Sequence, residues 1–399
     1  MAPGRRLGVL LLVVAALVGP ACQDDPEAVQ AAPTRATPSA PPSRPASTSS
    51  STTSTSSTTT APPPPPITMA FSGDLLPHAP VVRSAAAAGG GALDFGPLLA
   101  AMAPIISGAD IAICHMEVPV APSPDEVSGY PLFGAPIELV TAVHATGYDG
   151  CSTASNHSLD KGFDGVRSTL DTFDVVGLRH AGTARTPDEA AAITTYEVRG
   201  IRIAHLSYAY GFNGLPLPAD APWSANLIDA GRIHADAARA RQEGAALVVV
   251  SLHWGTEYRA APDGFQETVV SQLLPSEDID LVIGHHAHVV QPVRKVGATY
   301  VVFGLGNELS NQSEPSRRDG LTVVASAGPS FGRWRFTGLQ IVPTWVDLAG
   351  HRVLPVAPAL GDPATPPALA ADLRGSYDRT VATVTSGGAP GLEIPPIPG

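Results

Sequence analysis

From residue 67 to about residue 360, short apolar runs rich in β-branched residues alternate with alanine-rich runs of helical character. Strand character is clear in "ITMAFSGD" (67–74), "DIAICHMEV" (110–118) and "ALVVVSLHWG" (246–255), and helical character in "APIELVTAVHATG" (135–147) and "DAGRIHADAARARQEG" (229–244). Repeated strand–helix–strand order favours a buried, largely parallel sheet with functional side chains at the carboxyl ends of its strands. The sequence therefore predicts an α/β domain over 67–360, followed by a C-terminal helix and a disordered tail over 361–399.

The first 66 residues do not have the composition of a folded domain. Arg5 and Arg6 precede an apolar run over 7–18, which is typical of a secretory signal and short for a membrane-spanning helix. Small residues directly before Cys22 resemble a bacterial lipoprotein signal, in which the cysteine is lipidated; ordinary secretion is the alternative. Residues 23–66, rich in Ser, Thr and Pro, are predicted to form a disordered tether. We therefore expect a signal over 1–22 and an extracytoplasmic bacterial protein, anchored to the cell membrane through lipid or secreted.

The net charge and the cysteines indicate which partners and which cellular compartment suit the chain. The net charge is −12 and Lys161 and Lys295 are the only lysines, so no basic patch for nucleic acid is present. Besides Cys22, the chain has only Cys114 and Cys151. Outside the cytosol these two cysteines are able to pair, and the alternative is two buried thiols.

Polar side chains follow the predicted strands at the points where they end. Along an extended chain, residues two apart face the same side, so His286 and His288 are predicted to aim at one point while His285 aims away. Taken singly, each polar residue has another reading, as a hydrogen-bonded core histidine, a turn residue or a helix cap. Carboxylates, carboxamides and imidazoles together are ligands of Mn, Fe or Zn, and a bridging carboxylate holds two such ions. The pattern predicts a site for one or two divalent ions, built from Asp74, Glu117, Asn156, His157, His253, His286 and His288.

Six motifs in order resemble those of one known family, namely "FSGDLLP", "CHMEVPV", "ASNHSLDKG", "SLHWGTEY", "GHHAHVVQP" and "VVFGLGNEL". They are similar to the bacterial capsule-synthesis CapA (poly-γ-glutamate) family, within the calcineurin-like metallophosphoesterase superfamily. The resemblance covers about residues 67–350. It implies a metallophosphatase-like four-layer sandwich, in which two mostly parallel or mixed β-sheets are flanked by helices.

The resemblance also implies roles for the polar residues. Glu117 stands at the position of the bridging carboxylate, and Asn156 at that of a ligand through its amide oxygen. His157 resembles the catalytic histidine, which protonates the leaving group or stabilises the transition state. Asp160 either orients His157 or caps the following helix. The metal ligands implied in this way are Asp74, Glu117, Asn156, His253, His286 and His288.

The first and second motifs depart from the superfamily pattern. The first motif normally reads Asp-x-His, but Leu75 and Leu76 follow Asp74, and His78 lies four residues on. The first ion would then have fewer protein ligands, with water, His78 or substrate filling in. In the second motif His115 replaces an Asn that is common in the family, and it is either an added ligand or a partner that supports one.

A further set of residues is expected to contact substrate or to support the ligands. Glu257 is a candidate for this role, with a solvated loop carboxylate as the alternative. Asn307 lies in a glycine-rich loop and is expected to border the cleft. Trp254 either stacks on substrate or packs in the core, and packing is favoured. The full set predicted to contact substrate or support the ligands is His115, Glu257, His285 and Asn307.

Two functions are consistent with these observations. The first is an extracytoplasmic metal-dependent hydrolase that acts on a cell-envelope or capsule polymer, poly-γ-glutamate or a phosphoester, through metal-activated water. The alternative is a non-catalytic factor for polymer assembly or export with a degenerate metal site. His157 favours the enzyme, because a purely structural metal site has no use for a proton donor beside the ion.

Overall fold

The computed structural model describes residues 65–274 and 276–398. The predicted signal, the predicted lipidation site Cys22 and nearly all of the predicted tether lie outside these residues. Within the described ranges, none of the helices combines the length and the apolar character needed to cross a bilayer.

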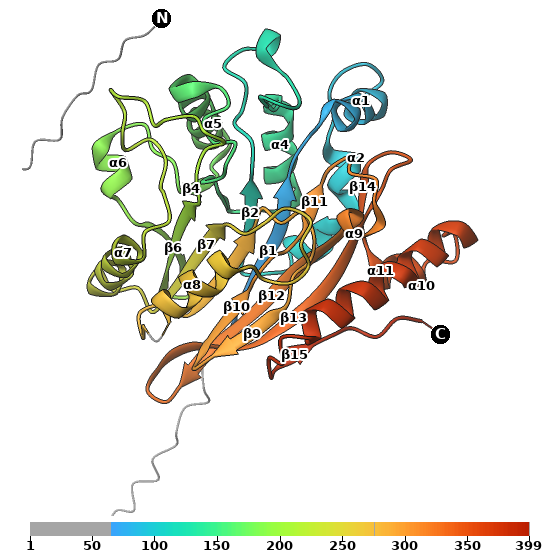
Figure 1. Ribbon diagram of the computed structural model, residues 1–399. Helices are drawn as coiled ribbons and strands as arrows, with labels where there is room; N and C mark the ends of the chain where they lie inside the picture. Colours follow the sequence, from blue (N-terminus) through green and yellow to red (C-terminus); the bar gives the residue numbers. More distant parts are fainter. Residues whose placement is uncertain (1–64, 275, 399) are drawn as a thin grey trace, which may run out of the picture. The chain divides into compact units, whose positions relative to one another are not determined.

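The first sheet has the strand order β14-β13-β12-β1-β2-β3-β4, with β11 paired to β1 and β15 paired to β13 (Figure 1). Strands β1 to β4 are parallel, and β12 to β14 add to them in antiparallel fashion. The strands are β1 (Ile67–Leu75), β2 (Ile111–Met116), β3 (Gly150–Ser152), β4 (Arg179–Ala181), β11 (Asn307–Leu309), β12 (Asp319–Ser330), β13 (Arg333–Asp347), β14 (Arg352–Pro355) and β15 (Leu392–Glu393).

The second sheet has the order β5-β6-β7-β8-β10-β9. Its central strands β6, β7, β8 and β10 are parallel, and the edge strands β5 and β9 are antiparallel to them. The strands are β5 (Thr194–Val198), β6 (Ile201–Ala209), β7 (Leu247–His253), β8 (Leu281–His285), β9 (Val293–Val296) and β10 (Thr299–Val302).

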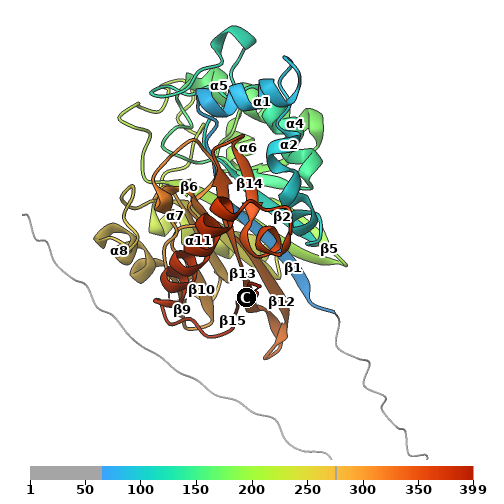
Figure 2. The ribbon, with the colours of Figure 1, turned by 90° about the vertical axis from the view of Figure 1, so that its right-hand side faces the viewer.

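Helices cover the outer faces of both sheets. One hydrophobic cluster joins α1 to α4 to the first sheet, another joins α7 and α8 to the second sheet, and a third fills the space between the sheets. Helices α10 and α11 lie against β13 (Figure 2). The helices are α1 (Ala79–Ala88), α2 (Gly96–Leu99), η1 (Ala100–Met102), α3 (Ala103–Ile106), η2 (Pro124–Glu126), α4 (Ile137–Thr146), α5 (Gly162–Val176), α6 (Pro187–Ala191), α7 (Ala230–Gln242), α8 (Gly264–Leu273), α9 (Pro315–Arg318), α10 (Val356–Gly361) and α11 (Pro367–Thr385).

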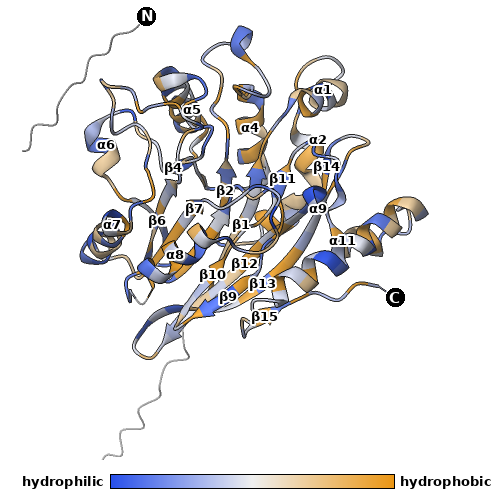
Figure 3. Ribbon diagram, viewed as in Figure 1, coloured by the Kyte–Doolittle hydropathy of each residue, from blue (hydrophilic) through white to orange (hydrophobic). Residues whose placement is uncertain are grey.

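Strand β7 shows why these residues form buried strands. Leu247 and Val249 face the space between the sheets, whereas Val248 and Val250 face α7 and α8. A strand buried on both faces needs a continuous apolar run with β-branched residues, which is what the sequence supplies. Figure 3 shows hydrophobic residues concentrated along the strands of both sheets. The polar residue His253 comes only at the end of β7, so burial of the strand fixes where its imidazole lies.

The predicted fold, two mixed sheets flanked by helices, is confirmed. Two details differ from the sequence prediction. The segment "LDFGPLLAAMAPIISGA" (93–109), whose sequence predicts one helix, is split into α2, η1 and α3. Pro97 and Pro104 cannot continue a helix, and each lies at the start of a new segment. The tail expected to be disordered contains β15, which pairs with β13, and Leu392 packs partly against the core between the sheets.

Candidate metal centre

Asp74 lies near the end of β1, fully buried, and both of its carboxylate oxygens are held. Its Oδ1 accepts a hydrogen bond from Nδ1 of His285 (3.0 Å), and its Oδ2 accepts one from the backbone N–H of His286 (3.1 Å). A Cβ on Gly73 would collide with the carbonyl oxygen of Gly306, so glycine is needed where β1 meets this loop. Burial raises the pKa of Asp74, but hydrogen bonds from its imidazole neighbours outweigh this and hold the pKa well below its usual range. Asp74 is therefore an ionised, fixed carboxylate.

Glu117 follows β2 and is also fully buried, but its carboxylate differs from that of Asp74 in its hydrogen bonding. Among the described residues, neither of its carboxylate oxygens has a hydrogen-bond donor. The nearest charged partner is His288, whose Nε2 lies 3.6 Å from Oε1. Burial raises the pKa of Glu117 well above its usual range, because an ionised carboxylate without donors is costly in the interior. A buried carboxyl group without donors either keeps its proton or is compensated by a cation.

His286 and His288 lie in the loop after β8, and both point into the same site. The extended-chain argument for their convergence was wrong, because β8 ends at His285 and both residues have positive φ angles, 86° and 53°. Burial lowers the pKa of His286 to about 4. At neutral pH this imidazole is therefore uncharged and has a nitrogen lone pair to offer to a metal ion. Burial lowers the pKa of His288 as well, but Glu117 and Asp74 raise it to about 9. Because Nδ1 of His288 contacts the Asn307 amide oxygen (3.0 Å), its Nε2 is left to face Glu117.

Two sets of ligand atoms share Glu117. Asn156 adds its Oδ1 to one set, 2.9 Å from Nε2 of His253. Ligand atoms about 2.1 Å from one ion lie up to about 4 Å apart. The 2.9 Å between the Asn156 and His253 atoms is therefore compatible with a shared zinc, manganese or iron ion. The residues fit divalent ions, with Glu117 between the two sets, which is the position that the family resemblance implies for it. The two sets, whose atoms lie within 4.8 Å of one another, are Asp74, Glu117 and His288, and Glu117, His253 and His286.

Two further imidazoles form a row behind the ligands. Nε2 of His115 lies 2.9 Å from Nδ1 of His253, and Nδ1 of His115 lies 2.8 Å from Oγ of Ser152. A His115 that accepts at Nε2 carries its proton on Nδ1 and donates it to Ser152, which leaves Nε2 of His253 free for an ion. The ring of His285 stacks on His115 at 4.0 Å and holds Asp74. The geometry therefore favours support of ligands over added ligation for His115. His285 turns toward the site and not away from it.

His157 and Asp160 form a close pair beside this centre. Nδ1 of His157 lies 2.6 Å from Oδ2 of Asp160, and the same oxygen accepts the backbone N–H of Phe133 (2.8 Å). Helix α5 begins at Gly162 with Lys161 as its N-cap residue and has no side-chain cap, so Asp160 does not cap it. Of the two predicted roles for Asp160, the structure is consistent with orienting His157. The imidazole is left with Nε2 as the atom that can act on substrate.

His78 and Trp254 do not join the ligand set. Nδ1 of His78 contacts the carbonyl oxygen of Leu76 (3.1 Å), and His78 is absent from the groups of described residues that are able to hold an ion. Trp254 is fully buried and donates its indole N–H to the carbonyl oxygen of Phe303 (2.9 Å). It packs in the core, as the sequence analysis favoured.

Glu257 lies at the solvent side of the centre. It is exposed, yet its carboxylate is within ligand distance of His286 and His288. Asn307 is buried and contacts His288, so it supports a candidate ligand from behind. The structure thus brings all of the predicted site residues of the described region to one place.

Two further residues, Tyr210 and Asn213, lie at the site and were not predicted from the sequence. The Tyr210 ring lies 4.7 Å from that of His286. Oδ1 of Asn213 accepts from Nδ2 of Asn156 (3.1 Å), which turns the Asn156 oxygen toward the centre. The signal was present in "AYGFNG" (209–214), because polar residues follow the end of β6 as they follow the other strands.

The two cysteines of the domain form a disulfide. Cys114 and Cys151 lie opposite each other on the parallel strands β2 and β3. Their chain neighbours, His115 and Ser152, form the next pair in the same register and make the hydrogen bond behind His253. The disulfide therefore fixes the strand pair that carries this part of the site.

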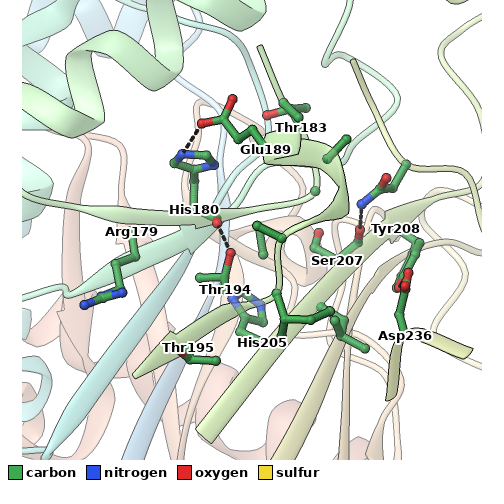
Figure 4. Close-up of a pocket in the computed structure, with 18 of the residues that line it drawn as sticks. Arg179, His180, Thr183, Glu189, Thr194, Thr195, His205, Ser207, Tyr208 and Asp236 are labelled. Atoms are coloured by element: carbon green, nitrogen blue, oxygen red, sulfur yellow. Dashed lines mark hydrogen bonds and ion pairs between the residues drawn. The ribbon is translucent and has the colours of Figure 1, made fainter. Parts of the chain in front are cut away.

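A second polar region, away from this centre, is a cavity of about 310 Å³ (Figure 4). Among its lining residues, Glu189 contacts His180 (3.4 Å), and Glu189 also pairs with Arg185 outside the lining (2.6 Å). The unpartnered polar atoms in its lining include Nδ1 of His205 and Oγ of Ser207. In the described part of the chain, the groups able to hold a metal all come from the centre around Glu117. The cavity therefore has polar character but no unpaired ligand set.

The fold and the ligand sets define an α/β sandwich with a candidate two-ion centre at the carboxyl ends of its strands. Residues 68–312 match the family model described as "Bacterial capsule synthesis protein PGA_cap". The chain belongs to this family.

Two curated relatives of the chain are named for PGA or capsule biosynthesis. The "PGA biosynthesis protein CapA" of Bacillus subtilis (strain 168) is 29% identical over 196 residues, which cover 47% of this chain and 49% of that protein. The "Capsule biosynthesis protein CapA" of Bacillus anthracis is 29% identical over 189 residues, 47% of this chain and 46% of that protein. The chain thus spans about half the length of these curated relatives. The solved calcineurin-like phosphoesterase YfkN from Bacillus subtilis aligns over 80% of this chain and 98% of that chain, with 12% identity and a TM-score of 0.42.

Proposed function

We propose that the protein is an extracytoplasmic metal-dependent hydrolase acting on a capsule or cell-envelope polymer, either poly-γ-glutamate or a phosphoester. The observation that carries this proposal is Glu117, a fully buried carboxylate without donors among the described residues, at the meeting point of two ligand sets. Because candidate ligands of both sets converge on Glu117, a bound cation would compensate the charge of its carboxylate.

The centre combines the groups that hydrolysis requires. Divalent ions held there would polarise a phosphoryl or carbonyl oxygen of the substrate and lower the pKa of a water molecule. Asp74, fixed by His285, and His253, supported by His115, would hold the ions in place. His157, with Nδ1 engaged by Asp160, would donate a proton from Nε2 to the leaving group.

The location and the polymer rest on separate observations. The Cys114–Cys151 disulfide supports an oxidising, extracytoplasmic compartment. The names of the two Bacillus relatives, which refer to capsule and PGA biosynthesis, support a capsule polymer as the substrate. Membrane attachment through a lipid on Cys22 is part of the same proposal, and it follows from the signal-like sequence alone.

One observation favours the alternative, a non-catalytic factor for polymer assembly or export. The set for the first ion contains only Asp74, Glu117 and His288, because Leu76 occupies the position of the usual histidine and His78 points elsewhere. A weakly held first ion would leave a structural site without hydrolysis.

His157→Ala separates the two functions. We expect wild-type protein to bind up to two transition-metal ions per chain and to hydrolyse bis-p-nitrophenyl phosphate or poly-γ-glutamate. The variant should keep its metal content, measured by elemental analysis, and lose hydrolysis by about 100-fold or more, because it lacks the proton donor. His234→Ala, on α7 away from the centre, is the matched control. A wild type that holds metal but hydrolyses neither substrate would favour the non-catalytic factor. A variant that hydrolyses as fast as wild type would show that His157 is not the proton donor.

A further inference from the structure

Tyr258 and Arg317 form a stacked pair at the solvent side of the metal centre. Cζ of Arg317 lies 3.7 Å from the centroid of the Tyr258 ring. That ring lies 6.0 Å, between centroids, from the ring of His288, and Tyr258 is 43% exposed. A positive charge is therefore held one aromatic ring away from a candidate metal ligand, at a place that solvent reaches.

The backbone ties both members of the pair to the loop that carries the histidines. Nδ2 of Asn307 donates to the carbonyl oxygen of Arg317 (2.9 Å), while Oδ1 of the same side chain contacts His288. The backbone N–H of Tyr258 donates to the carbonyl oxygen of Ala287 (2.7 Å). The position of the Arg317 charge relative to the centre is thus built into the fold.

The guanidinium of Arg317 forms no ion pair with the described residues. Its neighbour Arg318 faces Asp372 (3.9 Å), but within residues 65–274 and 276–398 no carboxylate forms an ion pair with Arg317. A guanidinium stacked by its face keeps the N–H donors of its edge for an oxyanion. In a chain of net charge −12, such a cation beside the site is a local exception.

We propose that Tyr258 and Arg317 form a subsite for a negatively charged group of the substrate, adjacent to the bond that lies at the metal centre. The substrate class is accordingly an anionic polymer, with a carboxylate or a phosphate in the neighbouring repeat unit. Because it concerns the substrate, this inference rests on the proposed function. The exposed carboxylate of Glu257 opposes an anion here, so binding at this subsite depends on the attraction of Arg317.

The test is binding of two polyanions to the metal-loaded full-length chain, measured by calorimetry at low and high salt. The probes are poly-γ-glutamate, which presents carboxylates, and a long-chain polyphosphate. We expect Arg317→Gln to weaken binding of one or both by about tenfold and to reduce its salt dependence. Arg317→Lys should have a binding affinity between those of wild type and Arg317→Gln, because lysine keeps the charge but lacks the planar guanidinium. Arg318→Gln, the matched control, should bind as wild type does.

The probe that loses affinity identifies the charged group. Equal binding of both polyanions by wild type and Arg317→Gln, at equal metal content, would overturn the inference, as would a wild type that binds neither. A chain that loses polyanion binding on Arg317→Gln but hydrolyses nothing in its wild-type form would retain the subsite and contradict only the hydrolase. The two proposals therefore fail by different results.

Discussion

Glu117 and Glu308 are both fully buried glutamates, and among the described residues neither has a hydrogen-bond donor for its carboxylate oxygens. Their neighbours differ. Glu117 lies among candidate ligands from β1, β7 and the loop after β8, whereas Glu308, on β11, lies beside Tyr148, whose hydroxyl donates to Ser72 (2.8 Å). Burial raises the pKa of Glu308 to about 8, with the Tyr148 hydroxyl lowering it in part, so Glu308 is a neutral acid at neutral pH.

The comparison shows that an unpartnered buried carboxylate does not by itself define a metal site. Glu308 avoids the cost of a buried charge by keeping its proton, because no basic group converges on it. At Glu117 imidazoles and a second carboxylate converge, so the proposed cation would replace the proton there. Three experiments test this distinction and the ligand arrangement around Glu117, in order of the effect expected.

The largest difference is expected in metal content. Glu117→Gln removes the carboxylate shared by both ligand sets and should abolish binding of at least one ion, with an affinity loss of about 100-fold or more. Glu308→Gln, an equally buried change of the same chemistry, should leave the metal content of the chain unchanged. Elemental analysis after dialysis against limiting Mn²⁺ or Zn²⁺ measures both. Equal metal content in the two variants would remove the basis of the comparison.

A smaller loss of metal affinity is expected when Asn156 loses its orientation. Asn213→Leu removes the hydrogen-bond acceptor that fixes the Asn156 amide. It should lower the affinity for the ion at His253 by about 10-fold to 100-fold. Asn213→Asp keeps an acceptor oxygen at the same position and should stay within a few-fold of wild type. Competition with a chromophoric chelator gives both affinities. If the leucine and aspartate variants bind this ion equally well, Asn213 does not orient Asn156.

The smallest effect concerns stability and pH at Glu308. The folded state keeps the Glu308 proton up to about pH 8, while the unfolded chain releases it near the ordinary value of 4.5. Because the folded state then binds more protons, stability falls as pH rises through this range. Glu308→Gln should raise the melting temperature at pH 8 by on the order of 3 °C and have little effect at pH 4.5. Glu393→Gln, on the exposed face of β15, is the control; the same shift at both pH values would show that Glu308 is not protonated by burial.

Much of the site was predictable because the sequence pattern and the chemistry coincide. Strands buried on both faces are continuous apolar runs, so polar residues such as Asp74 and His253 stand out where those runs end. The hydrogen bonds by which other side chains orient the candidate ligands were harder to predict from the sequence. The contact of His115 with His253 depends on the facing of two different sheets, and the approach of Asn213 to Asn156 depends on a loop with a positive φ angle at Asn213. The pairing of β15 with β13 was not predictable, because β15 has only two residues and its partner strand lies far away in the sequence.

The central claim, that Glu117 bridges two ions, is tested most directly by anomalous diffraction from crystals grown with Mn²⁺ or Zn²⁺. The account predicts two anomalous peaks about 3.5–4 Å apart, with Glu117 in contact with both. One peak should lie beside Asp74 and His288, and the other beside Asn156, His253 and His286. A fully loaded protein whose anomalous peaks lie away from Glu117 would contradict it.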